Sequence, residues 1–304
     1  HRGLFFDALA GDLQAQRLAQ ADNGGDVARA VAVGIWTSPR APVTLQPHDT
    51  EAGMRFLKIL MAMGVMGMSL AANTAQSAEI VVYSTTSAKE ALIELVPEFE
   101  HASGHKLKMN YGGGSALAKQ ILGGLSGDLY IGPDEFSDAL MKQGALLAGS
   151  RTVFALSRAG LAVRAGAPKP DISTPEKLKT ALLAAGKVSY SAGASGIQFV
   201  RILEQLGIAD AIAAKRVAPN PGELVGAVVA RGAADIGVQQ ISEFLPVAGI
   251  QIIEPLPKEF QQPIPYGATA FPKSTQRDAA QAFVKFLKSE PARKVLREKG
   301  LDPA

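Results

Sequence analysis

The chain has 304 residues, of which 47% are hydrophobic and 19% charged, so it can bury the cores of two lobes of ordinary domain size. The net charge of +3 is small, and the sequence lacks the basic stripe with interleaved aromatic residues that is typical of a nucleic-acid binder. There is no cysteine, which excludes thiol catalysis, cysteine-ligated metals and disulfides.

Residues 54–78 have the pattern of a secretory signal peptide. Two basic residues precede an apolar, Met-rich run over 59–72, and small residues follow as far as Ala78. The run is shorter than the ~20 residues of a membrane-spanning helix. We expect cleavage near Ser77 or Ala78 and export to the periplasm; a buried core helix is the alternative.

Residues 1–53 show no clean hydrophobic period. Because they precede a feature that belongs at an N-terminus, we interpret them as an upstream extension that is not native or is disordered. Translation would then begin at Met54.

From residue 79 onward, short apolar segments alternate with amphipathic ones, which predicts an α/β fold with a mainly parallel sheet. An extended run over 152–163 fits a strand that leaves one lobe for another, and 265–271 fits the return. The expected strands are 80–83, 106–111, 126–132, 152–163, 187–190, 234–238 and 250–253. The expected helices are 88–103, 115–122, one that opens at 133–135, 174–186, 197–207, 223–231, 275–288 and 291–299.

Two polar or glycine-rich loops in the first half precede helices. Thr86 and Ser87 follow the first strand, with Ser87 and Glu90 spaced as a capping box. Three glycines ending at Gly114 follow the second strand, with Ser115 expected as the helix N-cap. Free N–H groups and the positive end of the helix dipole make such a helix start an anion site.

The second half repeats this chemistry. Gly193 and Ser195 lie in a small-residue loop before the helix expected from residue 197, and Gly222 closes a Pro-rich turn before the helix expected from residue 223. Any one of these loops alone predicts only a turn and a cap. Four loops from both halves predict one ligand site, because ligands of such sheets gather where strands end and helices begin.

Groups for acid–base catalysis are few. Candidate bases are Asp128, Glu223, Tyr190 and Lys89, and Arg201 is the best cation for an organic acid, although each also fits a structural or solvated role. No Ser/His/Asp triad can be assembled, because the only histidines after residue 78 are His101 and His105, which lie close together on one exposed turn. We therefore assign no catalytic residue, no metal ligand and no cofactor.

Several segments resemble the periplasmic molybdate-binding proteins of ABC importers, which have the two-lobed type II solute-binding fold. The resemblance covers 79–303, and its most specific carriers are residues 111–121, 127–132, 233–238 and the helix pair over 283–300. It implies a tetrahedral oxyanion, molybdate or tungstate, bound between the lobes and released to an inner-membrane permease. It also implies that Ser87 and Ser115 bind the oxyanion through hydroxyl and amide groups, and Ser195 and Gly222 through amides.

Gln240 departs from the family, because it stands where well-known members place a tyrosine that contacts the oxyanion. The glycine triplet also stands where close members often carry serines. Relatives on the same fold resemble binders of other anions, and one branch resembles aconitate isomerase. An organic-acid (tricarboxylate) binder and an aconitate isomerase are therefore the alternatives.

The sequence thus predicts a solute-binding protein rather than an enzyme, monomeric and periplasmic, whose partners are a small anion and an ABC permease and not nucleic acid. We expect lobe I to span 79–160 and 264–304, and lobe II to span 161–263. The expected ligand-binding residues are Thr86, Ser87, Gly114, Ser115, Gly193, Ser195, Gly222 and Gln240.

Overall fold

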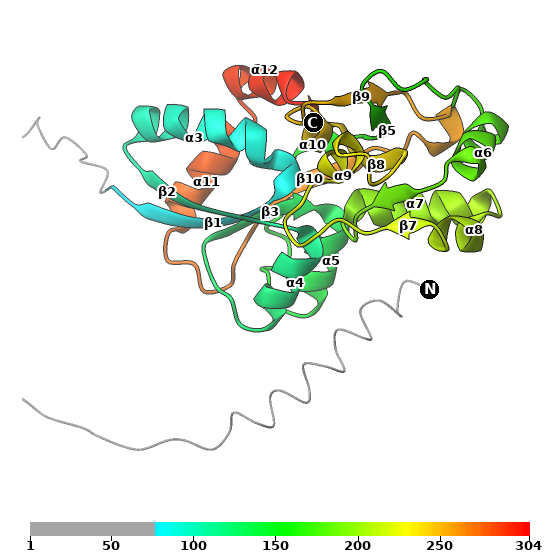
Figure 1. Ribbon diagram of the computed structural model, residues 1–304. Coiled ribbons are helices and arrows are strands. Elements are labelled where there is room, and N and C mark those ends of the chain that lie inside the picture. Colours follow the sequence, from blue (N-terminus) through cyan, green and yellow to red (C-terminus); the bar gives the residue numbers. More distant parts are fainter. Residues whose placement is uncertain (1–76) are drawn as a thin grey trace, which may run out of the picture. The chain divides into compact units, whose positions relative to one another are not determined.

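The computed structural model describes residues 77–304, which form two β-sheets flanked by helices (Figure 1). The expected extension over 1–53 and nearly all of the expected signal peptide lie outside the described residues. Within 77–304, none of the helices is both long and apolar enough to span a bilayer.

The first sheet has the strand order β11-β4-β10-β3-β1-β2. Strand β1 pairs in parallel with β2 and β3, whereas β10 is antiparallel to β3 and β4, and β11 is antiparallel to β4. The strands are β1 (Glu79–Thr85), β2 (Lys106–Gly112), β3 (Leu129–Pro133), β4 (Thr152–Ser157), β10 (Ile264–Ala270) and β11 (Leu301–Pro303).

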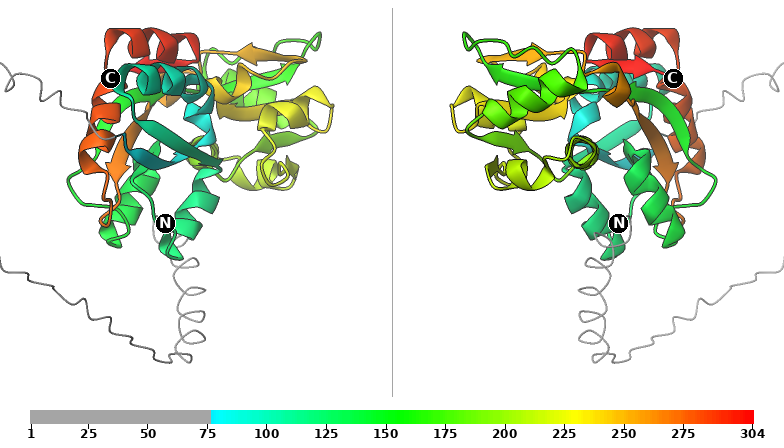
Figure 2. Two further views of the ribbon diagram at one scale, coloured as in Figure 1. Left: turned by 90° about the vertical axis from the view of Figure 1, so that its left-hand side faces the viewer. Right: turned by 90° about the vertical axis from the view of Figure 1, so that its right-hand side faces the viewer.

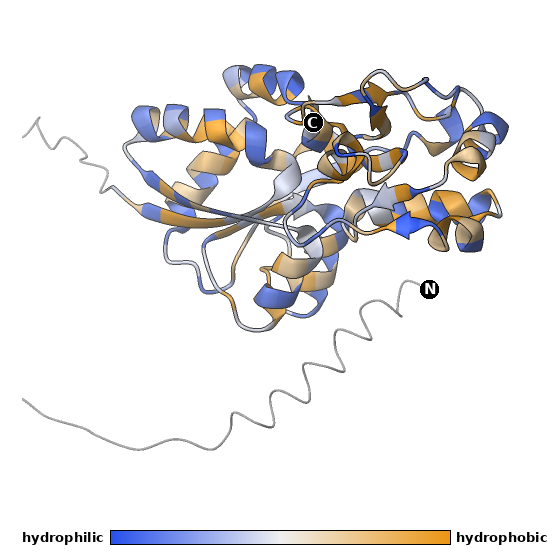
Figure 3. Ribbon diagram, viewed as in Figure 1, coloured by the Kyte–Doolittle hydropathy of each residue, from blue (hydrophilic) through white to orange (hydrophobic). Residues whose placement is uncertain are grey.

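Helices cover both faces of this sheet, and the whole is called lobe I here. Helices α3 (Lys89–Ser103), α11 (Arg277–Phe286) and α12 (Glu290–Glu298) share one hydrophobic core with the strands. Helices α4 (Gly114–Leu122) and α5 (Asp134–Lys142) lie on the opposite side from α3 and α12 (Figures 1 and 2). Orange and blue residues alternate along these helices in Figure 3, as expected of helices with one buried face.

The second sheet has the order β7-β6-β8-β5-β9, with β6 parallel to β7 and β8, and β5 antiparallel to β8 and β9. With its helices it forms lobe II. The strands are β5 (Ala159–Arg164), β6 (Val188–Tyr190), β7 (Arg216–Val217), β8 (Ile236–Gln240) and β9 (Ile250–Ile253), and the helices are α6 (Pro175–Ala184), α7 (Ala194–Gln205), α8 (Ala209–Ala213), α9 (Val225–Ala230) and α10 (Ile241–Phe244).

The chain crosses between the two sheets twice. Arg158 alone separates β4 from β5, and the segment after β9, which contains the 3-10 helix η2 (Lys258–Phe260), leads back to β10. The Arg158 guanidinium donates to Asp302 at 2.8 Å and to Glu254 at 3.2 Å. Both crossings and the last strand therefore meet at one arginine.

The predicted two-lobed α/β fold is confirmed, but both sheets are mixed rather than mainly parallel. Strands β10 and β5 each enter their sheet directly from the other lobe, without a crossover helix, and this reverses their direction. The run expected as one strand over 152–163 is two strands in different sheets. Four short elements were not predicted: β7, α8, α10 and β11.

Candidate functional site

The predicted loops follow neighbouring parallel strands in each lobe. In lobe I, β1 and β2 are in register with Thr85 opposite Gly112, so the loops after them begin side by side. In lobe II, β6 and β8 are in register with Tyr190 opposite Val238. The segments after β1, β2 and β6 carry three of the predicted loops, and the segment after β8 is α10, which was not predicted.

One hydrogen bond joins the loop after β2 to the loop after β6. The Ser115 hydroxyl donates to the Ala192 carbonyl oxygen at 2.7 Å. This contact runs from lobe I to lobe II and sets the start of α4 against the loop that opens α7.

The two helix starts are alike. Gly113 is the N-cap of α4 and Gly193 the N-cap of α7, and Ser115 and Ser195 occupy the second helical position of their helices. The expectation that Ser115 is itself the N-cap is wrong, and its hydroxyl is instead used between lobes. The first N–H groups of α4 and α7 lack a partner within their own helix, so they are the donors that an anion would use.

Two glycines in these loops are fixed by close packing. A Cβ on Gly114 would come within 2.6 Å of the Phe136 ring, and a Cβ on Gly196 within 1.8 Å of the Ser191 carbonyl oxygen. The Gly193 N–H in turn donates to the Ser191 hydroxyl at 3.1 Å. A side chain at Gly114 or Gly196 would therefore force one of these neighbours to move.

The loop after β1 is the 3-10 helix η1 (Thr86–Ala88), and α3 follows with Ala88 as an N-cap that makes no side-chain cap bond. The expected capping box between Ser87 and Glu90 is therefore wrong. The Thr86 and Ser87 side chains instead bond to Glu243 of lobe II, and this tertiary contact replaces a local cap.

Glu243 was not predicted as a site residue. It lies on α10, directly after β8, and is 7% exposed. The Thr86 hydroxyl donates to its Oε1 atom across the lobes, and the carboxyl also has hydrogen bonds to Ser87, to the Gln239 side chain and to the Gln240 backbone N–H. Burial raises the pKa of Glu243, and these hydrogen bonds oppose the rise.

Gln240, which is 3% exposed, lies beside this carboxyl. Its Nε2 atom donates to the Tyr266 hydroxyl at 3.2 Å, and the Thr85 hydroxyl donates to the same oxygen at 3.3 Å. A tyrosine hydroxyl therefore does stand next to Gln240, but it comes from β10 of lobe I. Burial raises the pKa of Tyr266 to about 12, so the phenol stays protonated at neutral pH.

A further ion pair joins the lobes beside α7. Arg201, predicted as the best cation for an organic acid, pairs with Glu135 of α5. Its charge is therefore partly neutralised by lobe I. On the same helix, the Gln198 side chain donates to the Gln262 carbonyl oxygen at 2.7 Å in the returning connection.

The other predicted residues take structural positions. The Asp128 carboxylate accepts from the Val81 N–H at 2.8 Å and from the Ser274 hydroxyl at 2.7 Å, which agrees with its expected structural role. Arg216 lies over the ring of Tyr190, 4.4 Å from its centroid. Lys89 begins α3 and is half-buried.

The fourth predicted loop ends in an exposed turn. Gly222 has a φ of +79°, and the helix after it, α9, begins at Val225 rather than at Glu223. Glu223 lies in the turn, where it accepts from Asn220 and pairs with Arg231. The end of β8, with Gln240 and Glu243, is instead the second segment of lobe II that contacts lobe I.

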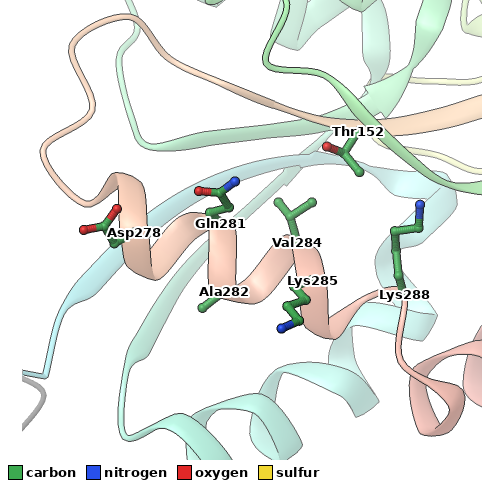
Figure 4. A pocket seen from close by; sticks show the side chains of 7 residues that line it. All are labelled: Thr152, Asp278, Gln281, Ala282, Val284, Lys285 and Lys288. Carbon is green, nitrogen blue, oxygen red and sulfur yellow. The ribbon is translucent and has the colours of Figure 1, made fainter.

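Elsewhere, a surface hollow lies between α11 and the start of β4 (Figure 4). Its lining includes Thr152, Asp278, Gln281 and Lys288, and no predicted site residue is among the residues that line it. Among residues 77–304, no group of three or more histidine, aspartate or glutamate side chains is placed to hold a metal ion.

Comparison with known proteins places this geometry in a family. Residues 80–302 match the family described as bacterial extracellular solute-binding protein. The chain is 33% identical over 229 residues to an aconitate isomerase of a Pseudomonas species, across 74% of this chain and 87% of that protein. It is 25% identical over 241 residues to the molybdate-binding protein of Azotobacter vinelandii, across 77% of this chain and 94% of that protein.

Among solved structures, the sulfate-binding protein of Mycobacterium tuberculosis superposes with a TM-score of 0.64 at 17% identity, over 75% of this chain and 87% of that one. At this identity the likeness concerns the fold alone. The family match and the 33% identical relative go further: the chain belongs to the bacterial extracellular solute-binding protein family.

Proposed function

We propose that this protein binds a small, oxygen-rich anion between its two lobes and delivers it to an inner-membrane ABC permease from the periplasm. The observation that carries the proposal is the Ser115–Ala192 hydrogen bond, which sets the N-termini of α4 and α7, one from each lobe, against each other. Two helix starts then direct free N–H groups and positive dipole ends at one place.

In this site the ligand contacts come from the two serines and their loops. Ser115 and Ser195, with Gly114 and Gly193, supply amides at the two helix starts, and Thr86, Ser87 and Gln240 supply side chains from the adjoining strand ends. Gly222 remains a predicted amide donor from its exposed turn. Binding is non-covalent, and the lobes close over the ligand by hinge motion at the two crossings.

Molybdate and tungstate are the first ligands to test, since a molybdate-binding protein is 25% identical to this chain. Isothermal titration of the monomeric protein with molybdate, tungstate, sulfate and phosphate gives the direct readout. Binding that weakens in the Ser87→Ala, Ser115→Ala double variant supports the proposed site, because this variant removes hydroxyl groups and keeps every backbone amide. Flat heats for all four anions, together with no thermal stabilisation by organic anions, contradict anion binding.

A second candidate is an isomerase acting on aconitate. Two observations favour it: the 33% identical relative is named aconitate isomerase, and Glu243 is a buried carboxyl beside the loops. Moving a proton next to a carboxylate needs a base with a tuned pKa, and Glu243 is such a group. An ultraviolet assay that follows trans-aconitate against cis-aconitate separates the two, because turnover abolished by Glu243→Gln would favour the enzyme.

A further inference from the structure

The hydroxyl groups at this site direct their protons at the protein itself. The Thr86 hydroxyl donates to Glu243, and the Ser115 hydroxyl donates to the Ala192 carbonyl oxygen. A hydroxyl has one proton and two acceptor lone pairs, so a hydroxyl that donates to the protein offers only acceptors to a guest. The Ser87 side chain is likewise hydrogen-bonded to the Glu243 carboxyl.

A further acceptor in the same cluster has no partner. The Gln240 Oε1 atom is buried and makes no hydrogen bond, while its Nε2 atom is held by Tyr266. An unpaired buried acceptor costs roughly 1 to 3 kcal/mol, which a donor on the guest would recover. Thr86 and Ser87 on η1, together with Gln240 at the end of β8, therefore offer acceptors rather than donors.

Glu243 keeps the hydroxyl protons of Thr86 and Ser87 directed at the protein, because its carboxyl is the acceptor for both. When ionised, it also carries the same sign of charge as the guest that the α4 and α7 helix starts would hold. Two like charges in a poorly solvated interface repel more strongly than in water, and a fully deprotonated dianion would suffer most.

We propose that Glu243, through the Thr86 and Ser87 hydroxyls and together with Gln240 Oε1, selects anions that carry a hydrogen-bond donor over fully deprotonated oxyanions. The preferred class is hydroxy acids and hydrogen-bearing anions, held by the amides of α4 and α7 at one end and by these acceptors at the other. This inference rests on the proposed anion site and narrows its ligand.

Matched pairs of anions test the selection. Malate and succinate differ by one hydroxyl, and at pH 7 phosphate retains a proton that sulfate lacks; molybdate is the fifth anion. Titration calorimetry on the full chain should give a Kd at least about tenfold lower for the donor-bearing member of a pair, which corresponds to ~1.4 kcal/mol. A preference for malate over succinate would point to an organic acid as the ligand, whereas a preference only for phosphate over sulfate would point to an inorganic anion.

Glu243→Gln tests the assignment to Glu243, because the amide keeps the shape, removes the charge and frees hydroxyl protons for the guest. Sulfate or molybdate should bind about tenfold more tightly to this variant, and the preference within each pair should shrink. Glu204→Gln, on the exposed face of α7, is the matched control. It should leave the affinity for sulfate and molybdate and the preference within each pair unchanged.

The outcomes separate this inference from the proposed function. Molybdate or sulfate binding as tightly as the donor-bearing anions to the native protein overturns the selection but leaves the anion site intact. A lack of binding by all five anions contradicts both. The preference for donor-bearing anions is measured on the native protein alone. The inference can therefore be contradicted even if the Glu243→Gln variant fails to fold.

Discussion

The Ser115 hydroxyl donates to the Ala192 carbonyl oxygen across the two lobes, at 2.7 Å. One proton thus links the start of α4 to the loop that opens α7, at the place proposed for the anion. The same serine joins the two lobes and stands at the second position of a helix start that is proposed to bind the anion.

Ser115→Ala should therefore shift the ligand-free protein toward open lobes and weaken anion binding by about fivefold, the effect of losing roughly 1 kcal/mol of hydrogen bonding. Small-angle X-ray scattering should detect a larger radius of gyration, and calorimetry should detect the weaker binding. Ser103→Ala is the control, because the Ser103 hydroxyl also donates to a carbonyl at 2.7 Å, but within lobe I, to Phe99. An unchanged radius and affinity in Ser115→Ala would show that the contact has no role in closure.

Glu243 should make stability depend on pH. Burial raises the pKa of its carboxyl, so the folded protein binds this proton more tightly than the unfolded chain does. Its contribution to the free energy of unfolding is greatest below the ordinary pKa of 4.5 and falls as the pH rises toward the folded-state pKa.

The Glu243→Gln variant carries no titrating group at this position. As the pH is raised from about 4 to about 8, the variant should therefore gain free energy of unfolding relative to the native protein. The limiting slope is ~1.4 kcal/mol per pH unit between the unfolded-state and folded-state pKa values of Glu243, and the Tm of the variant should rise relative to the native Tm over the same range. Scanning calorimetry at several pH values measures this. A Tm difference that is constant with pH would mean that Glu243 has the same pKa in the folded and unfolded states.

Gly196→Ala should distort the loop before α7. The added Cβ would lie 1.8 Å from the Ser191 carbonyl oxygen, which is backbone and cannot move away cheaply. We expect a loss of about 2 kcal/mol or more in the free energy of unfolding, measured in urea, and weaker anion binding. Gly113→Ala is the contrast, since nothing lies within 4 Å of its Cβ position; equal losses in both would refute the steric explanation.

Asp128→Ala should destabilise lobe I without changing which anion binds. The carboxylate is 7% exposed and accepts from the Val81 N–H and the Ser274 hydroxyl, and both would be left without a partner. At roughly 1 to 3 kcal/mol for each buried unpaired group, a loss of about 2 to 6 kcal/mol is expected in urea unfolding. The exposed Asp210→Ala should change stability by less than about 0.5 kcal/mol.

The loops could be predicted because the residues that form each of them are consecutive in the sequence. Three glycines and a serine between an apolar strand and an amphipathic segment indicate a helix start wherever the chain goes, and Gly193–Ser195 repeats the pattern. The N-cap assignments failed because side chains such as Ser87 and Ser115 have partners in the other lobe, which local spacing does not encode.

Glu243 could not be found in the same way. It lies on a helix of only four residues, too short for a hydrophobic period, and its partners Thr86 and Ser87 are more than 150 positions away. One signal was available: an acidic residue five positions after the expected strand over 234–238 lies where strand ends gather ligands. The mixed sheets were missed because strand direction depends on the two crossings, and not on the composition of the strands.

Arg158 ties both crossings to the last strand, through Glu254 and Asp302. The Ala304 backbone N–H also donates to the Phe154 carbonyl oxygen at 3.0 Å, so the final residues are bound to β4 next to the first crossing. If the lobes close by the proposed hinge motion, a fluorescent domain or immobilisation tag fused after Ala304 would lie close to the hinge and report little of that motion. Reporter labels for a biosensor would then belong on α4 and α8, one in each lobe.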